Sequence, residues 1–124
     1  MWTFKQSTGQ LFQDDEFIAS GYSGGNCGKN PDWVNNPDSQ ENHGATIPQG
    51  IYTAGEALDH SILGAFAIPL IPDPSNNMYN RSGFYMHGDT SACNQSASEG
   101  CLIFPPSIRH EYYNSADTTL KVIP

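Results

Sequence analysis

The sequence has few basic side chains. Five lysines and arginines stand against 13 aspartates and glutamates in 124 residues, and the formal net charge at pH 7 is −8. A protein that binds nucleic acid or an anionic membrane surface needs a basic patch to neutralise phosphates and release their counterions. We therefore expect neither nucleic acid nor a membrane as a partner.

Long hydrophobic runs and long helical periodicity are also absent. No apolar run approaches the roughly 20 residues of a membrane-spanning helix, and Met1 is not followed by a basic and then a hydrophobic segment, so we predict no cleaved signal peptide. The 12 glycines and 9 prolines favour a loop-rich, mainly β fold. The length fits one domain, residues 1–124.

Cysteine is scarce and odd in number: Cys27, Cys93 and Cys101. In an oxidising compartment, three cysteines are accounted for by one disulfide and one free thiol, whereas in a reducing compartment all three would be thiols. The candidate disulfide is Cys27–Cys93, which would leave Cys101 reduced.

The stretch from Gly83 to Phe104 carries the candidate chemistry. Residues 84–86 and 102–104 are apolar and bounded by turn formers, so both are predicted to be buried strands. His87 then follows the first strand, and Cys101 precedes the second. If the strands pair, the imidazole can convert the thiol to a thiolate, which is the nucleophilic form.

Two glycines and two polar residues surround these candidates. Gly88 and Gly100 allow the backbone to approach a ligand closely, and we expect Ser98 and Glu99 to keep the thiol of Cys101 near the surface. The alternative is structural: an isolated cysteine usually packs as a small hydrophobe, and a histidine at a strand end is usually a satisfied polar group.

Elsewhere, apolar residues between turn-forming glycines and prolines predict strands at residues 2–5, 10–13, 17–22, 51–52, 62–71 and 117–123. The longest is expected to end at Pro69 and Pro72. A short helix should begin at Pro105 and Pro106, with Ser107 as its cap.

Three motifs occur in a suggestive order: the turn Ile47-Pro48-x-Gly50-x-Tyr52, the step His87-Gly88, and Ser98-x-Gly100-Cys101. They resemble the L,D-transpeptidase catalytic domain, whose pattern is a Pro-x-Gly turn, a histidine and then Ser/Thr-His-Gly-Cys. Two earlier segments, Tyr22-Ser23-Gly24 and Lys29-Asn30-Pro31, are similar to a branch of type VI secretion effectors that attack the peptidoglycan of rival bacteria.

This resemblance implies a single-domain β-sandwich or mixed sheet with one or two short helices and long loops. It implies that Cys101 attacks the carbonyl of the third, meso-diaminopimelate-type residue of a stem tetrapeptide, releasing the terminal D-Ala and leaving a thioester. Water would complete an L,D-carboxypeptidase reaction, and an amine would complete a transpeptidation. His87 would be the base, the carbonyl of Gly88 would orient it, and the N–H groups of Gly100 and Cys101 would hold the oxyanion.

The sequence departs from the family pattern beside the thiol. Glu99 stands where the family has histidine, the loop between the histidine and the cysteine is short, and the arginine often found just after the cysteine is absent. Arg109 and Arg81 remain as candidates for gripping a substrate carboxylate. We favour Arg109, with a plain surface charge as the alternative. Ser98, Glu99 and Tyr85 are the other candidate substrate contacts.

The remaining expectations concern setting and partners. The resemblance implies an antibacterial toxin, a monomer, that is secreted without a cleaved N-terminal signal, acts in the periplasm of a target bacterium and is blocked by an immunity protein. A phage-encoded wall enzyme and an inactive wall-binding module are the alternatives. The histidines show no metal-ligand spacing, so we expect no metal or other cofactor; a metal hydrolase using His87, Asp89 and Cys101 is a further, weaker alternative.

Overall fold

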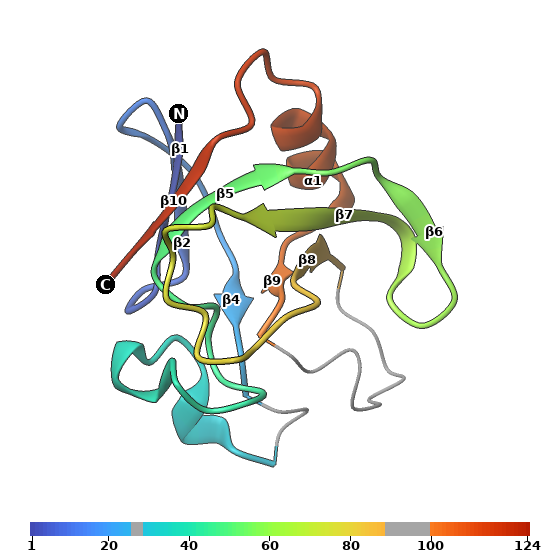
Figure 1. Cartoon of the computed structure of the whole chain (residues 1–124). Coiled ribbons are helices and arrows are strands. Elements are labelled where there is room, and N and C mark those ends of the chain that lie inside the picture. Colours follow the sequence, from blue (N-terminus) through green and yellow to red (C-terminus); the bar gives the residue numbers. More distant parts are fainter. Residues whose placement is uncertain (26–28, 89–99) are drawn as a thin grey trace.

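The computed structural model describes residues 1–25, 29–88 and 100–124 (Figure 1). Its fold is mainly β, as the composition predicts. The strands are β1 (Trp2–Lys5), β2 (Gln10–Gln13), β3 (Glu16–Ser20), β4 (Tyr22–Ser23), β5 (Gly50–Ala54), β6 (Leu58–His60), β7 (Gly64–Pro72), β8 (Tyr85–His87), β9 (Leu102–Ile103) and β10 (Leu120–Ile123). The helices are the 3-10 turns η2 (Pro31–Trp33) and η3 (Pro37–Ser39) and the α-helix α1 (Pro106–Tyr113).

The strands form one strongly curled, mixed sheet. Its order is β3-β2-β1-β10-β5-β7-β8-β9-β4, and β6 pairs with β7. The pairs β1–β10 and β8–β9 are parallel, and the other pairs are antiparallel. The two edge strands β3 and β4 are joined by the single residue Gly21, whose N–H donates to the carbonyl of Gly9 (2.8 Å). The sheet must therefore curl until its edges meet, which makes it nearly closed.

The inside of this curl is the core. Alternating residues of β1 and β10 point inward, and in this parallel pair Trp2 lies beside Leu120 and Phe4 beside Val122. Edge-to-face aromatic contacts extend the core, including one between Trp2 and Tyr112, whose ring centroids lie 5.4 Å apart. Burial of each such side chain stabilises the fold by about 2–3 kcal/mol, which is why the alternation in the sequence sets the side of each strand that faces in.

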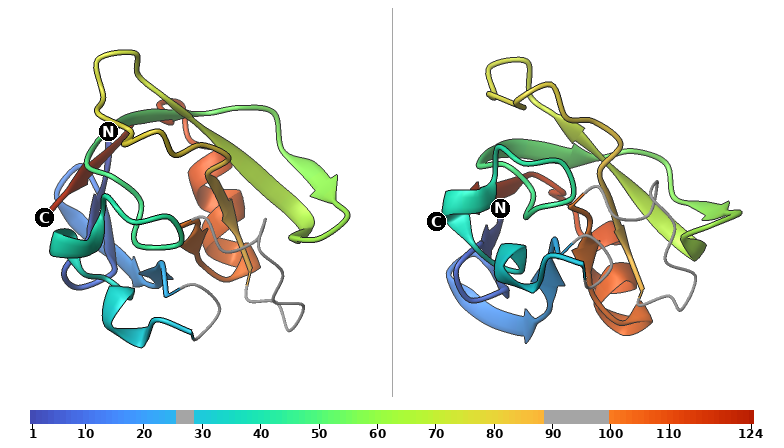
Figure 2. Two further views of the ribbon diagram at one scale, coloured as in Figure 1. Left: turned by 60° about the horizontal axis from the view of Figure 1, so that its bottom comes forward. Right: turned by 90° about the horizontal axis from the view of Figure 1, so that it is seen from below.

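The β6–β7 hairpin projects from the body (Figures 1 and 2). The expected strand of residues 62–71 is β7, but it begins later and runs through Pro69 to Pro72. Our expectation that Pro69 ends the strand was wrong for a geometric reason. The carbonyl of Pro69 accepts from Gly55, the first residue beyond the end of β5 (2.8 Å), so the missing N–H of the proline also faces Gly55 and removes only the last hydrogen bond of the ladder.

The helix α1 begins at Pro106 and lies against β7 and β8. Its N-cap residue is Pro105, and no side chain caps it, so the expected capping role of Ser107 was wrong. Proline fits the first turn because its missing N–H would be unpaired there in any case.

Candidate active site

The strands β8 and β9 lie side by side and parallel, with Met86 opposite Leu102 and His87 opposite Ile103. The pairing agrees with the sequence hypothesis, although β8 is shifted by one residue and includes His87 itself. Cys101 immediately precedes β9 and is two residues from Ile103, so strand alternation places it on the same side of the pair as His87. One strand spacing across and two residues along correspond to about 8 Å between the two Cα atoms, a span that an imidazole and a thiol can bridge.

His87 is held with a defined ring orientation. Its side chain is 1% exposed, and its Nδ1 lies 2.7 Å from the carbonyl oxygen of Gly88. Because a carbonyl only accepts, this contact requires a proton on Nδ1, and a neutral ring then has its lone pair on Nε2. This is the tautomer in which Nε2 can act as a base.

Cys101 is a reduced cysteine that is 3% exposed, and its Sγ lies 3.9 Å from the carbonyl oxygen of Gly83. The expectation that it lies near the surface was therefore wrong. The cause is the turn before it: Gly100 has a φ of +87°, which turns the chain inward beside the core residue Phe84.

Gly100 is closely surrounded by backbone. A methyl group at this position would lie 2.3 Å from the carbonyl oxygen of Ala45. The carbonyl of Gly100 accepts a hydrogen bond from the hydroxyl of Ser23 (2.7 Å), and the same hydroxyl accepts from the N–H of Ile47 (2.9 Å). Ser23 is fully buried. This one hydroxyl therefore ties β4, the Pro-x-Gly turn and the cysteine segment together.

Sequence reasoning missed this role of Ser23. The residue belongs to the segment Tyr22-Ser23-Gly24, which contributed to the resemblance, but a single serine at a strand end carries no sign of its distant partners. The partners lie 24 and 77 residues further along the chain.

The two candidate arginines are both buried. Arg81 donates to the carbonyls of Gln40, Ala45 and Thr46, and its guanidinium lies 5.1 Å from the ring centre of Phe84. These contacts hold the loop that covers Gly100, which is a structural role.

Arg109 comes from α1 and lies at the C-terminal end of the β8–β9 pair. It is 6% exposed, so the surface-charge alternative was wrong. Its Nη1 donates to the carbonyl of Phe104 (3.0 Å), and a methyl group on Gly88 would lie 2.5 Å from that nitrogen. Burial lowers the pKa of Arg109 from its ordinary value. Among the described residues, no carboxylate pairs with it.

The remaining candidates are less well placed or fall outside the described residues. Tyr85 on β8 is half-buried, and its ring lies edge-on to that of His60 on the projecting hairpin, with 5.4 Å between the ring centroids. The predicted disulfide Cys27–Cys93 and the candidates Ser98, Glu99 and Asp89 lie outside the described residues.

Within residues 1–25, 29–88 and 100–124, no group of three or more histidine, cysteine, aspartate or glutamate side chains could hold a metal ion. None of the helices there has the length and apolar character needed to cross a membrane.

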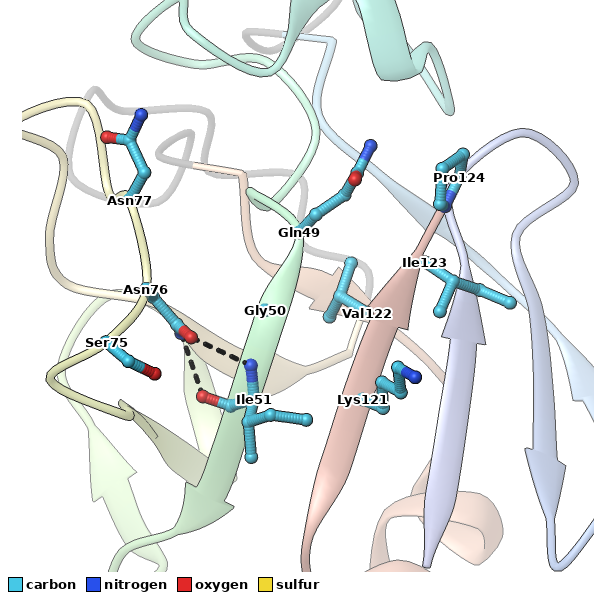
Figure 3. A pocket seen from close by; sticks show the side chains of 10 residues that line it. All are labelled: Gln49, Gly50, Ile51, Ser75, Asn76, Asn77, Lys121, Val122, Ile123 and Pro124. Carbon is cyan, nitrogen blue, oxygen red and sulfur yellow. Dashed lines mark hydrogen bonds between the residues drawn. The ribbon is translucent and has the colours of Figure 1, made fainter.

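A separate cavity of about 420 Å³ lies at the ends of β5 and β10 (Figure 3). One of its ten lining residues is Asn76, whose side-chain amide pairs with both backbone groups of Ile51 at 2.8 and 3.0 Å, as a neighbouring strand would. None of the candidate catalytic residues lines this cavity.

A scan against protein-family models gives no match for this chain, and a search of curated proteins finds no relative.

Proposed function

We propose that this protein is a cysteine enzyme that cleaves or exchanges the terminal D-Ala of peptidoglycan stem tetrapeptides. The observation that carries the proposal is the parallel β8–β9 pair with its oriented His87, because strand alternation continued from Ile103 to Cys101 puts the reduced thiol on the same side as the imidazole. A nucleophile beside a base that is itself oriented by a third group is the arrangement that acyl transfer requires.

Each group then has one role. The proton of Cys101 moves to Nε2 of His87, the sulfur forms a bond to the carbonyl carbon of the third residue, and the amide C–N bond breaks as the histidine returns the proton to the leaving D-Ala amine. Water or an acceptor amine then attacks the thioester and regenerates the thiol. The Gly88 carbonyl keeps the ring in the required tautomer.

The substrate class rests on the motif resemblance. The Ile47-Pro48-x-Gly50 turn and the Gly100-Cys101 segment, which carry that resemblance, are joined through the Ser23 hydroxyl, and this contact supports the proposal. Secretion as an antibacterial effector and inhibition by an immunity protein are part of the same proposal. A phage-encoded wall enzyme and a catalytically inactive wall-binding module are the alternative functions.

The reaction is tested by incubating the protein with purified disaccharide-tetrapeptide, with and without D-methionine, and following the products by mass spectrometry. We expect loss of D-Ala, or its exchange, with the wild type and none with Cys101→Ala. An unchanged tetrapeptide, with the wild type folded and its thiol intact, would contradict the proposal and favour the binding module.

A second test asks whether His87 activates the thiol. Burial slows the labelling of any cysteine, so wild type and His87→Gln should be compared in a Cys27→Ser/Cys93→Ser background, where Cys101 is the only thiol. We expect iodoacetamide to react at least about tenfold faster with the His87 protein at pH 7, because the thiolate is the reacting form. Equal rates in two folded proteins would contradict a catalytic pair.

A further inference from the structure

The guanidinium of Arg109 is a buried cation with no carboxylate partner among the described residues. Its Nε is also buried and makes no hydrogen bond there. Burying a charge without a counter-charge is unfavourable, so such a group needs an explanation in the structure around it.

Arg109 is connected to the end of β8 by two routes, one through Phe104 and one through Gly88. Its Nη1 donates to the carbonyl of Phe104 (3.0 Å), and the N–H of Phe104 donates to the carbonyl of His87 (3.1 Å). The same guanidinium lies against Gly88, whose carbonyl faces Nδ1 of His87 (2.7 Å). The arginine comes from α1, where its own N–H donates to the carbonyl of Pro105 (3.2 Å), so it is anchored at its base.

We propose that Arg109 is a positioning residue: its guanidinium supports Gly88 and so keeps the Gly88 carbonyl against Nδ1 of His87. The glycine is required at position 88 because the guanidinium occupies the space of a side chain, and not because of a left-handed backbone. This inference rests on the proposed function only for its kinetic consequence. The effect on the histidine ring can be measured whether or not the protein is an enzyme.

The direct test is the tautomer of His87 by NMR of ¹⁵N-histidine-labelled protein, with His87→Gln used to assign its signals. In the wild type we expect the ring proton on Nδ1. In Arg109→Met, which keeps an apolar stem but removes the guanidinium, we expect a measurable fraction with the proton on Nε2 instead. Lys121→Met removes an exposed positive charge from β10 and should leave the His87 signals unchanged. An unaltered tautomer in folded Arg109→Met would overturn the proposal.

A double-mutant cycle tests the contact itself. Gly88→Ala should lower the urea midpoint when Arg109 is present, because the new methyl group would lie 2.5 Å from Nη1. In the Arg109→Met background the same substitution should cost much less, because the obstructing group is gone. An equal loss in both backgrounds would show that Arg109 does not act through Gly88. If Arg109→Met fails to fold, Gly88→Ala alone, which displaces the guanidinium, should shift the His87 tautomer, and an unshifted tautomer would overturn the proposal.

The kinetic arm separates positioning from substrate binding. A misplaced base should lower kcat by about 10²-fold with little change in KM. The reverse, a raised KM with kcat unchanged, is expected if Arg109 grips a substrate carboxylate, and would overturn the proposal. If the wild type turns over no tetrapeptide, the proposed function fails while the NMR and unfolding results still decide the role of Arg109.

Discussion

Replacing Ser23 by alanine should destabilise the fold more than any other loss of a single hydroxyl among the described residues. The side chain is fully buried, and its oxygen donates to the carbonyl of Gly100 and accepts from the N–H of Ile47. The structure gives neither of these backbone groups another partner among the described residues. The substitution therefore leaves a buried acceptor and a buried donor unsatisfied at once.

The magnitude follows from those two groups. An unsatisfied buried polar group costs about 1–3 kcal/mol, so two of them, with some local relaxation, should lower the free energy of unfolding by about 2–4 kcal/mol. This is a large share of the roughly 5–15 kcal/mol that stabilises a typical domain. For a chain of this size we expect the melting temperature to fall by about 10 °C.

Urea unfolding followed by tryptophan fluorescence measures the loss, and Ser39→Ala is the matched control. Ser39 is also a buried serine, but its hydroxyl serves only its own loop, and its main acceptor, the carbonyl of Asn36, keeps a bond from the Ser39 N–H (3.0 Å). The control should cost about 1 kcal/mol or less. If Ser23→Ala is no more destabilising than Ser39→Ala, Ser23 does not join the three segments as we describe.

Other predictions follow from single sites. Gly100→Ala should cost more than about 3 kcal/mol by thermal unfolding, whereas Gly64→Ala, with a similar φ but open space around it, should cost only about 1–2 kcal/mol; equal losses would contradict the crowding at Gly100. Hydrogen bonds from Thr119 lower the pKa of Asp117. The ionised carboxylate therefore stabilises the fold above the ordinary pKa of aspartate, and this stabilisation is lost as the pH falls through the lowered pKa. In urea unfolding between pH 5 and pH 2, Asp117→Asn should lack this part of the loss of stability. The predicted disulfide leaves one free thiol, so alkylation without reductant should modify one of the three cysteines, and three modified cysteines would contradict the bridge.

Much of the local structure was predictable because local patterns fix it. Alternation predicts strands at residues 2–5 and 117–123; the first is present as β1, and the second is present as β10 but begins only at Leu120. Pro105 and Pro106 predict the start of α1, but the absence of a side-chain cap at this N-terminus was not predicted. Proline in a strand was misjudged, because whether Pro69 disrupts a ladder depends on where the neighbouring strand stops.

The site was predictable only in outline. Two apolar segments flanking a polar loop suggest that His87 and Cys101 approach one another, and the β8–β9 pair agrees with this. The burial of Cys101 was not predictable from its polar neighbours, because the turn at Gly100 directs the chain under the loop that Arg81 holds.

The sequence by itself determined the fold class and the position of most strands, and it singled out the two residues on which the proposed chemistry depends. Those features follow from side-chain periodicity and turn formers, which act over a few residues. Only the tertiary structure decided that β8 and β9 run parallel, that Ser23 joins three segments and that Arg109 packs on Gly88. Each of these depends on contacts between distant parts of the chain, which form only when the sheet curls and its edges β3 and β4 meet.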